Sequence, residues 1–265
     1  MLFATMATLA ALMATLPSTA GATTTPAPGY EQFAGCPHPG LMTIETCFRT
    51  SFTGGSLQMG NKEIPIETPF TLSGGVTPTG KYGAGPKGGL QPAKQRVPGG
   101  VVGLTGLTWL LEFFSSEALT LYAVIELAGI PSEPLSEPVS LPVKVHLINS
   151  VLGNNCYVGS NAEPIELELI TGTTKPPSPN SPITGSAGST SLTGNGVTDV
   201  TGGTYVDNSF FAPGANGCVL TLFGYPPSSL DEEIDAMSDL PSEAGSNSAI
   251  LNFDTESVSA ATVYP

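Results

Sequence analysis

Three glutamates and one histidine have the types and spacing that could carry chemistry in this sequence. All four lie in stretches that alternate apolar and polar residues: Glu126, His146, Glu166 and Glu168. Glycoside hydrolysis requires two facing carboxylates, and histidine is the side chain that most often transfers protons at neutral pH. We therefore take these residues as a candidate ligand cleft. The alternative is that they only keep one face of a sheet hydrated.

The sequence contains none of the common catalytic motifs. It has no G-x-S-x-G, no H-E-x-x-H and no phosphate-binding P-loop. A G-x-G-x-x-G occurs at Gly83, Gly85 and Gly88, but Pro86 interrupts it. A dinucleotide-binding turn must follow a buried strand and open a helix, so a loop is favoured here. The second histidine, His38, lies in a proline-rich loop. We assign no catalytic residue, no metal and no cofactor, and we expect a protein that is not an enzyme.

The cysteine content indicates disulfides. The four cysteines are Cys36, Cys47, Cys156 and Cys218. No C-x-x-C occurs and the chain has only 2 histidines, which argues against a zinc site. An even, small number of cysteines is typical of exported proteins, and three pairings are possible. We favour Cys36–Cys47 and Cys156–Cys218, because each bond then closes a loop within its own region.

The first residues predict export. Residues 1–22 carry no charge and are rich in leucine, alanine, methionine and threonine, and they end in Ala-Gly-Ala. This pattern predicts a secretory signal peptide that is cleaved after Ala22. The competing interpretation is an uncleaved hydrophobic anchor, since the segment lacks the usual lysine or arginine. Residues 23–30 then read as a flexible spacer. We expect a secreted or cell-surface protein.

Charge and length narrow the class of protein. The 265 residues carry a net charge of −14, which argues against nucleic acid as a partner. Hydrophobic residues make up 40% of the chain, enough to build a core. No apolar run of about 20 residues follows the signal segment, so no membrane span is predicted in the mature chain. The partners that remain are cell-wall or extracellular components.

Period-two alternation gives the fold class. The stretches 118–128, 141–147 and 165–169 each place apolar residues on one face and polar residues on the other. This pattern is typical of antiparallel strands with one buried face. We predict a mainly β fold, an antiparallel β-sandwich-like domain with one or two short helices and long loops rich in glycine and proline.

We predict one β-rich domain over residues 31–265, with two unusual segments inside it. Residues 80–100 form a basic, glycine-rich loop that holds four of the eight lysines and arginines. Residues 171–190 are rich in proline and threonine. We interpret the second segment as an excursion within the domain rather than as a linker, because the favoured Cys156–Cys218 bond spans it.

The most apolar stretch of the mature chain, residues 101–114, predicts a short helix that packs on the core. It contains Trp109, the only tryptophan, and the helical spacing is carried by Leu107, Leu110, Leu111 and Phe114. Two alternatives stay open for this segment. It could contact a membrane surface, or it could hold a small apolar ligand beside Trp109 in a closed cavity.

A second helix is predicted after residue 229. Ser229 and Glu232 have the spacing of a capping box, an apolar stripe follows, and Pro241 ends the segment.

Several runs of residues resemble an uncharacterised group of exported actinobacterial proteins. The runs are VPGGVVGLTGLTWLLEFF, LYAVIELAG, SLPVKVHLIN, VLGNNCYVGS, PIELELITGTT, DNSFFAPGANGC and NFDTESVSAATVYP. The resemblance covers most of the mature chain. It implies export and a bacterial cell-surface or extracellular setting, and it carries over no activity and no catalytic residue.

Two functions compete on these grounds. The first is a non-enzymatic secreted or cell-surface protein with a structural or interaction role, which the missing catalytic motifs favour. The second is a secreted hydrolase or glycan-binding protein that uses a carboxylate-lined cleft. The sequence does not fix the ligand, the oligomeric state or the cleavage site.

Overall fold

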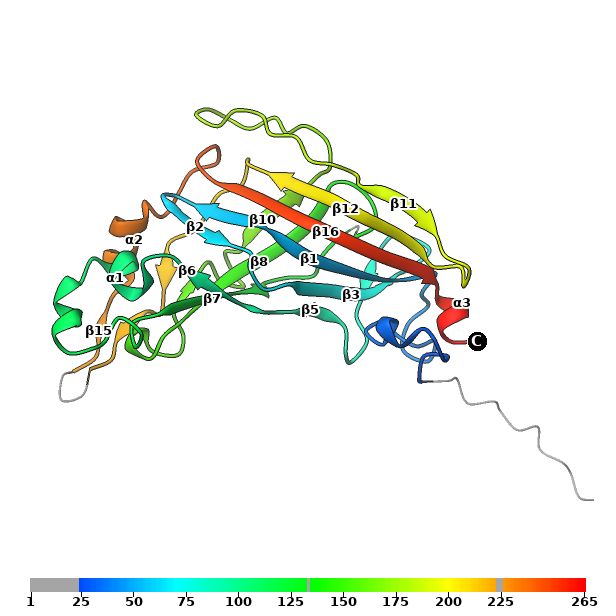
Figure 1. Ribbon diagram of the computed structural model, residues 1–265, viewed down its shortest axis with the longest axis horizontal. Coiled ribbons are helices and arrows are strands. Elements are labelled where there is room, and N and C mark those ends of the chain that lie inside the picture. The colour runs from blue at the N-terminus through cyan, green and yellow to red at the C-terminus, as the bar shows by residue number, and fades with distance from the viewer. Residues whose placement is uncertain (1–23, 133, 223–225) are drawn as a thin grey trace, which may run out of the picture.

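The computed structural model describes residues 24–132, 134–222 and 226–265. Within these residues, one antiparallel sheet of eight strands faces a second of six strands (Figure 1). A two-stranded sheet and three short α-helices complete the fold. The predicted mainly β, sandwich-like class is confirmed. The predicted signal peptide lies outside the described residues.

The longest strands run through the middle of the eight-stranded sheet. Its main order is β11-β12-β16-β1-β3-β4, with β2 paired to β1 and β5 paired to β3. The bounds are β1 (Thr46–Met59), β2 (Lys62–Pro65), β3 (Phe70–Val76), β4 (Tyr82–Gly83), β5 (Gly89–Gln91), β11 (Ser189–Leu192), β12 (Thr198–Asp207) and β16 (Ser248–Ser259).

Strands β1 and β16 pair along almost their whole length. Ala249, Leu251 and Phe253 alternate into the core from β16, as period two requires. The register shifts by one residue after Phe52. Just beyond this bulge Gly55 has a φ of 106°, and a Cβ there would overlap the carbonyl of the partner strand. Only glycine fits this position without displacing β16.

The six-stranded sheet has the order β13-β9-β8-β7-β6, with β10 paired to β8. Its strands are β6 (Lys94–Val97), β7 (Leu121–Leu127), β8 (Val139–Ile148), β9 (Tyr157–Val158), β10 (Ile165–Leu169) and β13 (Ala215–Asn216). Three of them match the strands predicted from alternation. β7 begins later than residue 118, because the amides of Leu119 and Thr120 donate to Ser115 and Glu117 in a preceding turn.

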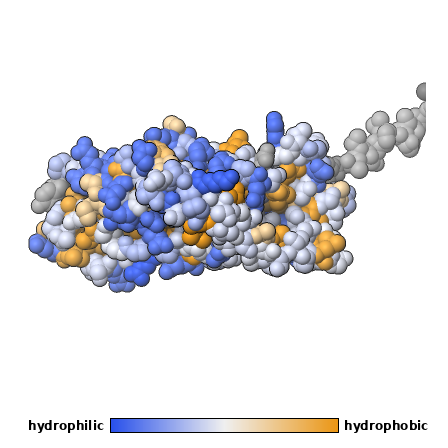
Figure 2. Space-filling model, turned by 90° about the horizontal axis from the view of Figure 1, so that it is seen from above, coloured by the Kyte–Doolittle hydropathy of each residue, from blue (hydrophilic) through white to orange (hydrophobic). Residues whose placement is uncertain are grey.

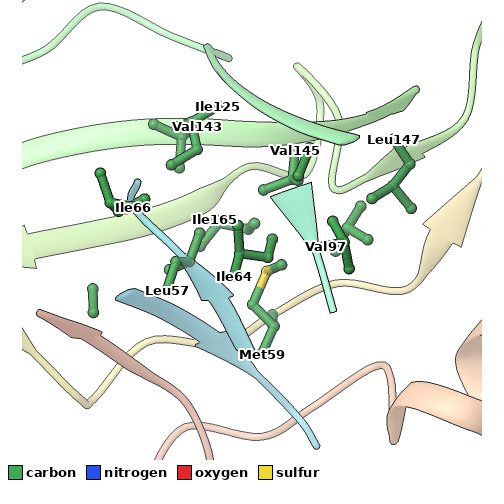
Figure 3. Packing of buried hydrophobic residues seen from close by; sticks show 14 of the residues in the cluster. Leu57, Met59, Ile64, Ile66, Val97, Ile125, Val143, Val145, Leu147 and Ile165 are labelled. Atoms are coloured by element: carbon green, nitrogen blue, oxygen red, sulfur yellow. The ribbon is translucent and has the colours of Figure 1, made fainter. Parts of the chain in front are cut away.

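The core lies between the two sheets. Leu57 and Met59 from β1 and Ile64 from β2 point toward Val143 and Val145 from β8 (Figure 3). Each of these side chains is at least 97% removed from solvent. Burying one such side chain contributes about 1.5–3 kcal/mol, so this layer is the main source of stability.

The remaining elements are short and lie at the ends of the sandwich. They are η1 (Glu31–Phe33), α1 (Gly100–Thr105), η2 (Thr108–Glu112), η3 (Ser150–Leu152), β14 (Val219–Leu220), β15 (Ser228–Ser229), α2 (Asp231–Ser238) and α3 (Ala260–Val263). The C-terminal helix α3 lies at one end of the long axis, while α1, α2 and β15 lie at the other (Figure 1).

Both favoured disulfides are present. Cys36 bonds Cys47, and Cys156 bonds Cys218, so all four cysteines are paired. The first bond lies in a small apolar cluster with Phe33 near the C-terminal helix. The expected spacer, from residue 24 on, is held against the same end, since the amide of Ala27 donates to Val263 at 2.8 Å.

Residues 80–100 do not form one loop as expected. They contain β4, β5 and β6. The G-x-G-x-x-G glycines serve close packing instead. The amide of Gly85 donates to the carbonyl of Gly35 at 2.9 Å, and a Cβ at Gly88 would overlap the same carbonyl. In the segment 171–190, Thr173 and Thr184 face each other in an isolated bridge before β11 begins.

The two predicted helices differ from expectation. The segment 101–114 is split into α1 and η2 at Gly106, which has a φ of 72° and ends α1. The second helix, α2, lacks the capping box, because Leu230 precedes it and no side chain caps its N-terminus. Ser229 lies one residue too early, and its hydroxyl accepts from the amide of Asp231.

Candidate functional site

Two of the four candidate residues come together on the outer face of the six-stranded sheet. Glu126 on β7 lies opposite Lys144 on β8, and His146 follows on the same face. The Glu126 carboxylate accepts from His146 Nδ1 at 3.2 Å and approaches Lys144 Nζ at 3.8 Å. His146 Nε2 lies 3.1 Å from the carbonyl of Asn154.

A tyrosine completes this polar cluster. The ring of Tyr157 stacks on His146 with centroids 4.3 Å apart, and Lys144 Nζ lies 4.8 Å from its centroid. Burial, and after it the nearby Glu126 charge, raises the pKa of the Tyr157 hydroxyl. These hydrogen-bond, ion-pair and ring contacts join side chains of β7, β8 and β9. The cluster therefore stabilises the pairing of the three strands.

The other two candidates stand apart from this cluster. Glu166 lies opposite Pro142, and Glu168 lies opposite Ser140. Both are exposed, and the buried Leu167 lies between them in β10. Among the described residues, no hydrogen bond or ion pair joins either carboxylate to Glu126. The four residues thus share one sheet face but do not form a single constellation.

Carboxylates gather instead on the outer face of the eight-stranded sheet. There Asp199, Asp254 and Glu256 line a shallow depression of about 330 Å³ with Arg49. Arg49 Nη1 lies 3.5 Å from the Glu256 carboxylate. No local pattern in the sequence indicates this group, because its members become neighbours only through the register of β1, β12 and β16.

An apolar groove lies at the end of the molecule that carries α1 and β15. Its volume is about 690 Å³. One wall comes from η2 and the two residues after it, and the other comes from the β14–β15 hairpin. The lining residues are Trp109, Phe113, Phe114, Leu220, Leu222, Pro226 and Ser228.

The first wall is held by one buried leucine. Leu110 is fully buried in the core, so its neighbours in the 3-10 turn must point outward. The Trp109 and Phe113 rings meet edge to face, with centroids 5.9 Å apart. Such a pair is a favoured aromatic geometry that stabilises this arrangement of the two rings.

The second wall is held by a disulfide and three hydrogen bonds. Cys218, which directly precedes β14, is bonded to Cys156. Its amide donates to the Asp231 carboxylate at 2.8 Å, and its carbonyl accepts from the amide of Leu230 at 2.9 Å. The amide of Thr221 donates to Val151 at 2.9 Å. These contacts place β14 and β15 against η2 and η3.

The groove leaves large apolar side chains open to solvent. Trp109 is 38% exposed and Phe113 is 66% exposed, and the neighbouring Leu111 is 53% exposed. Hydrophobic surface is visible at this end among hydrophilic residues (Figure 2). The expectation that Leu111 packs on the core is therefore wrong, because the turn ends as a 3-10 helix and not as an α-helix. The alternative of a closed cavity beside Trp109 is not what the structure has, because the space there is an open groove.

No match to this chain was found among protein-family models, curated proteins or solved structures. Among the residues that the structure describes, no group of three or more metal-ligating side chains comes together. Within the same residues, no helix has the length and hydropathy needed to cross a membrane.

Proposed function

We propose that this chain is a non-catalytic secreted or cell-surface binding protein, and that its apolar groove is the binding site. The observation that carries the proposal is the groove itself, about 690 Å³ lined almost entirely by apolar side chains. Pockets of about 300–1,000 Å³ with such a lining are typical of sites for small ligands. The ligand is an apolar molecule, or the apolar part of a cell-wall or extracellular component.

The chemistry of the lining supports binding rather than catalysis. Among the described residues that line the groove, Ser228 is the one with a side-chain hydroxyl. A serine nucleophile needs a base within hydrogen-bond reach, and among the described residues no side chain is hydrogen-bonded to the Ser228 hydroxyl. The polar cluster of Glu126 and His146 belongs to the outer face of the six-stranded sheet and lines no part of the groove.

The location outside the cytoplasm rests on three supports. Both disulfides join fully or almost fully buried cysteines, and structural disulfides of this kind are typical of exported proteins. The uncharged segment at residues 1–22 predicts a signal peptide, and the resemblance to exported actinobacterial proteins points to the same compartment.

The unique tryptophan makes the proposal testable. Trp109 lines the groove, so an uncharged fluorescent probe such as N-phenyl-1-naphthylamine should quench its emission by energy transfer on binding. We expect Phe113→Ser to weaken binding by about tenfold, because a large part of the apolar contact is lost. Leu192→Ser is the matched control, since Leu192 is 72% exposed on β11, outside the groove. Equal affinity in both variants would show that the groove is not the site.

A further inference from the structure

We propose that the natural ligand is an uncharged long-chain amphiphile, whose alkyl chain fills the groove, and that the site rejects the corresponding anions. This inference rests on the proposed function, because it names the ligand class of the same groove. Three observations on the described residues carry it: the two-walled apolar lining, the position of the Ser228 hydroxyl, and the charges around the site.

The lining suits an alkyl chain. The aromatic wall and the leucine wall offer contact along both sides of a flexible chain, and no lining residue in the described part of the chain is charged. The Trp109 and Phe113 rings are stabilised by their edge-to-face contact. Binding of an alkyl chain between two preorganised walls costs less free energy than binding by loops that must first become ordered.

One polar group is placed to meet a head group. Ser228 begins β15 and is exposed at the hairpin wall of the groove. Its hydroxyl can donate one hydrogen bond and accept two. It therefore matches an alcohol, ester or glycerol head group, and it offers no positive charge to a carboxylate or phosphate.

The charges near both walls are negative. Glu112 ends η2 between two exposed apolar residues, Leu111 and Phe113. On the other side, α2 begins two residues after β15 with three consecutive acids, Asp231–Glu233. No ion pair in the described part of the chain neutralises Glu112 or the acids of α2. A protein with a net charge of −14 adds a general repulsion of anions to this local field.

A positively charged side chain, Arg96, lines a different depression. Arg96 lines a space of about 420 Å³ with Leu111, Ser116 and Leu119. It shares no lining residue with the apolar groove. An anionic amphiphile could reach this guanidinium only by leaving the groove around Leu111. The experiment must therefore exclude binding of an anionic head group by Arg96.

Two ligands with the same ten-carbon chain separate these possibilities. Displacement of N-phenyl-1-naphthylamine by 1-decanol and by decanoate should be measured at neutral pH and low ionic strength, below the aggregation limit of each. We expect decanol to bind on the order of tenfold more tightly, because the carboxylates of Glu112 and Asp231–Glu233, next in the chain to both walls, repel the anion. The difference should shrink in high salt and in Glu112→Gln. It should persist in Glu45→Gln, an exposed acid at the opposite end of the molecule.

The outcomes distinguish the two proposals. If neither the probe nor either ten-carbon ligand binds, the proposed function fails. If the probe binds but decanol does not displace it, the groove is apolar but not a site for alkyl chains, and this inference fails alone. Decanoate affinity equal to that of decanol, or decanoate binding lost in Arg96→Gln, would likewise overturn it. Preference for decanol that depends on Glu112 and on salt would support it.

Discussion

Removal of the Cys156–Cys218 disulfide should destabilise the protein more than removal of Cys36–Cys47. The two bonds form a matched pair for this test. All four cysteines are buried, so replacement by alanine leaves cavities of similar size. The bonds differ in the loop that each closes, with sequence separations of 62 and 11 residues.

The expected magnitudes follow from the entropy of loop closure in the unfolded chain. For the longer loop the closure entropy corresponds to about 4 kcal/mol at 25 °C, and for the shorter loop to about 3 kcal/mol. We therefore expect Cys156→Ala/Cys218→Ala to lower the free energy of unfolding by about 4 kcal/mol, and to exceed Cys36→Ala/Cys47→Ala by about 1–1.5 kcal/mol.

Urea unfolding checks this prediction if two probes are followed together. Trp109 fluorescence follows unfolding at the groove end, while far-ultraviolet circular dichroism follows unfolding of both sheets. If the two transitions coincide, the free energy of unfolding can be calculated with a two-state model. The long-loop variant should also bind the apolar probe more weakly, because its bond holds the hairpin wall. A smaller loss of stability in the long-loop variant than in the short-loop variant would refute the entropy argument.

Two further predictions concern titration. Burial raises the pKa of Tyr82 and of Tyr205 to about 12, above the ordinary value of about 10. The folded protein therefore holds these phenol protons more tightly than the unfolded chain. The resulting contribution to the free energy of unfolding is complete below pH ~10 and is lost as the pH rises through about 12. An ultraviolet absorbance titration should show these two tyrosines ionising last, and the unfolding midpoint should fall over the same interval. Burial, reinforced by the charge of Asp231, also raises the pKa of Asp235, so its ionised form costs stability at pH values above that pKa. Asp235→Asn keeps an acceptor for the amide of Ala215 and should be at least as stable as the wild type at pH 7, with urea midpoints that vary less with pH.

Local patterns were sufficient for three strands of the six-stranded sheet, β7, β8 and β10. In β10 every second residue is buried, and the alternation of apolar and charged residues at Ile165, Glu166 and Leu167 predicts this burial. The disulfide pairing could also be predicted, because each bond joins cysteines of one region. These features depend on neighbours in sequence or on short loops, which a pattern of residue types can represent.

The candidate site could be predicted only in part. The segment around Trp109 was identified from its apolar residues, but its helical spacing suggested a core contact for Leu111 that the break at Gly106 prevents. The second wall of the groove lies about a hundred residues later in the chain. Nothing in the spacing of Leu220 and Leu222 indicates that they face Trp109, since this proximity depends on the disulfide and on the packing of the hairpin on η3.

The same reasoning explains why the carboxylates proved misleading. Glu126, Glu166 and Glu168 were selected because they alternate with apolar residues, but that pattern marks the solvent face of a sheet and carries no information on concavity. Flat outer faces of a sandwich favour cross-strand pairing, as Glu126, Lys144 and His146 show. A concave apolar surface arises here where the sheets end and short elements close the core incompletely. In this architecture the sheets position a site that the short elements at one end create, and the Cys156–Cys218 disulfide anchors the wall that β14 and β15 form.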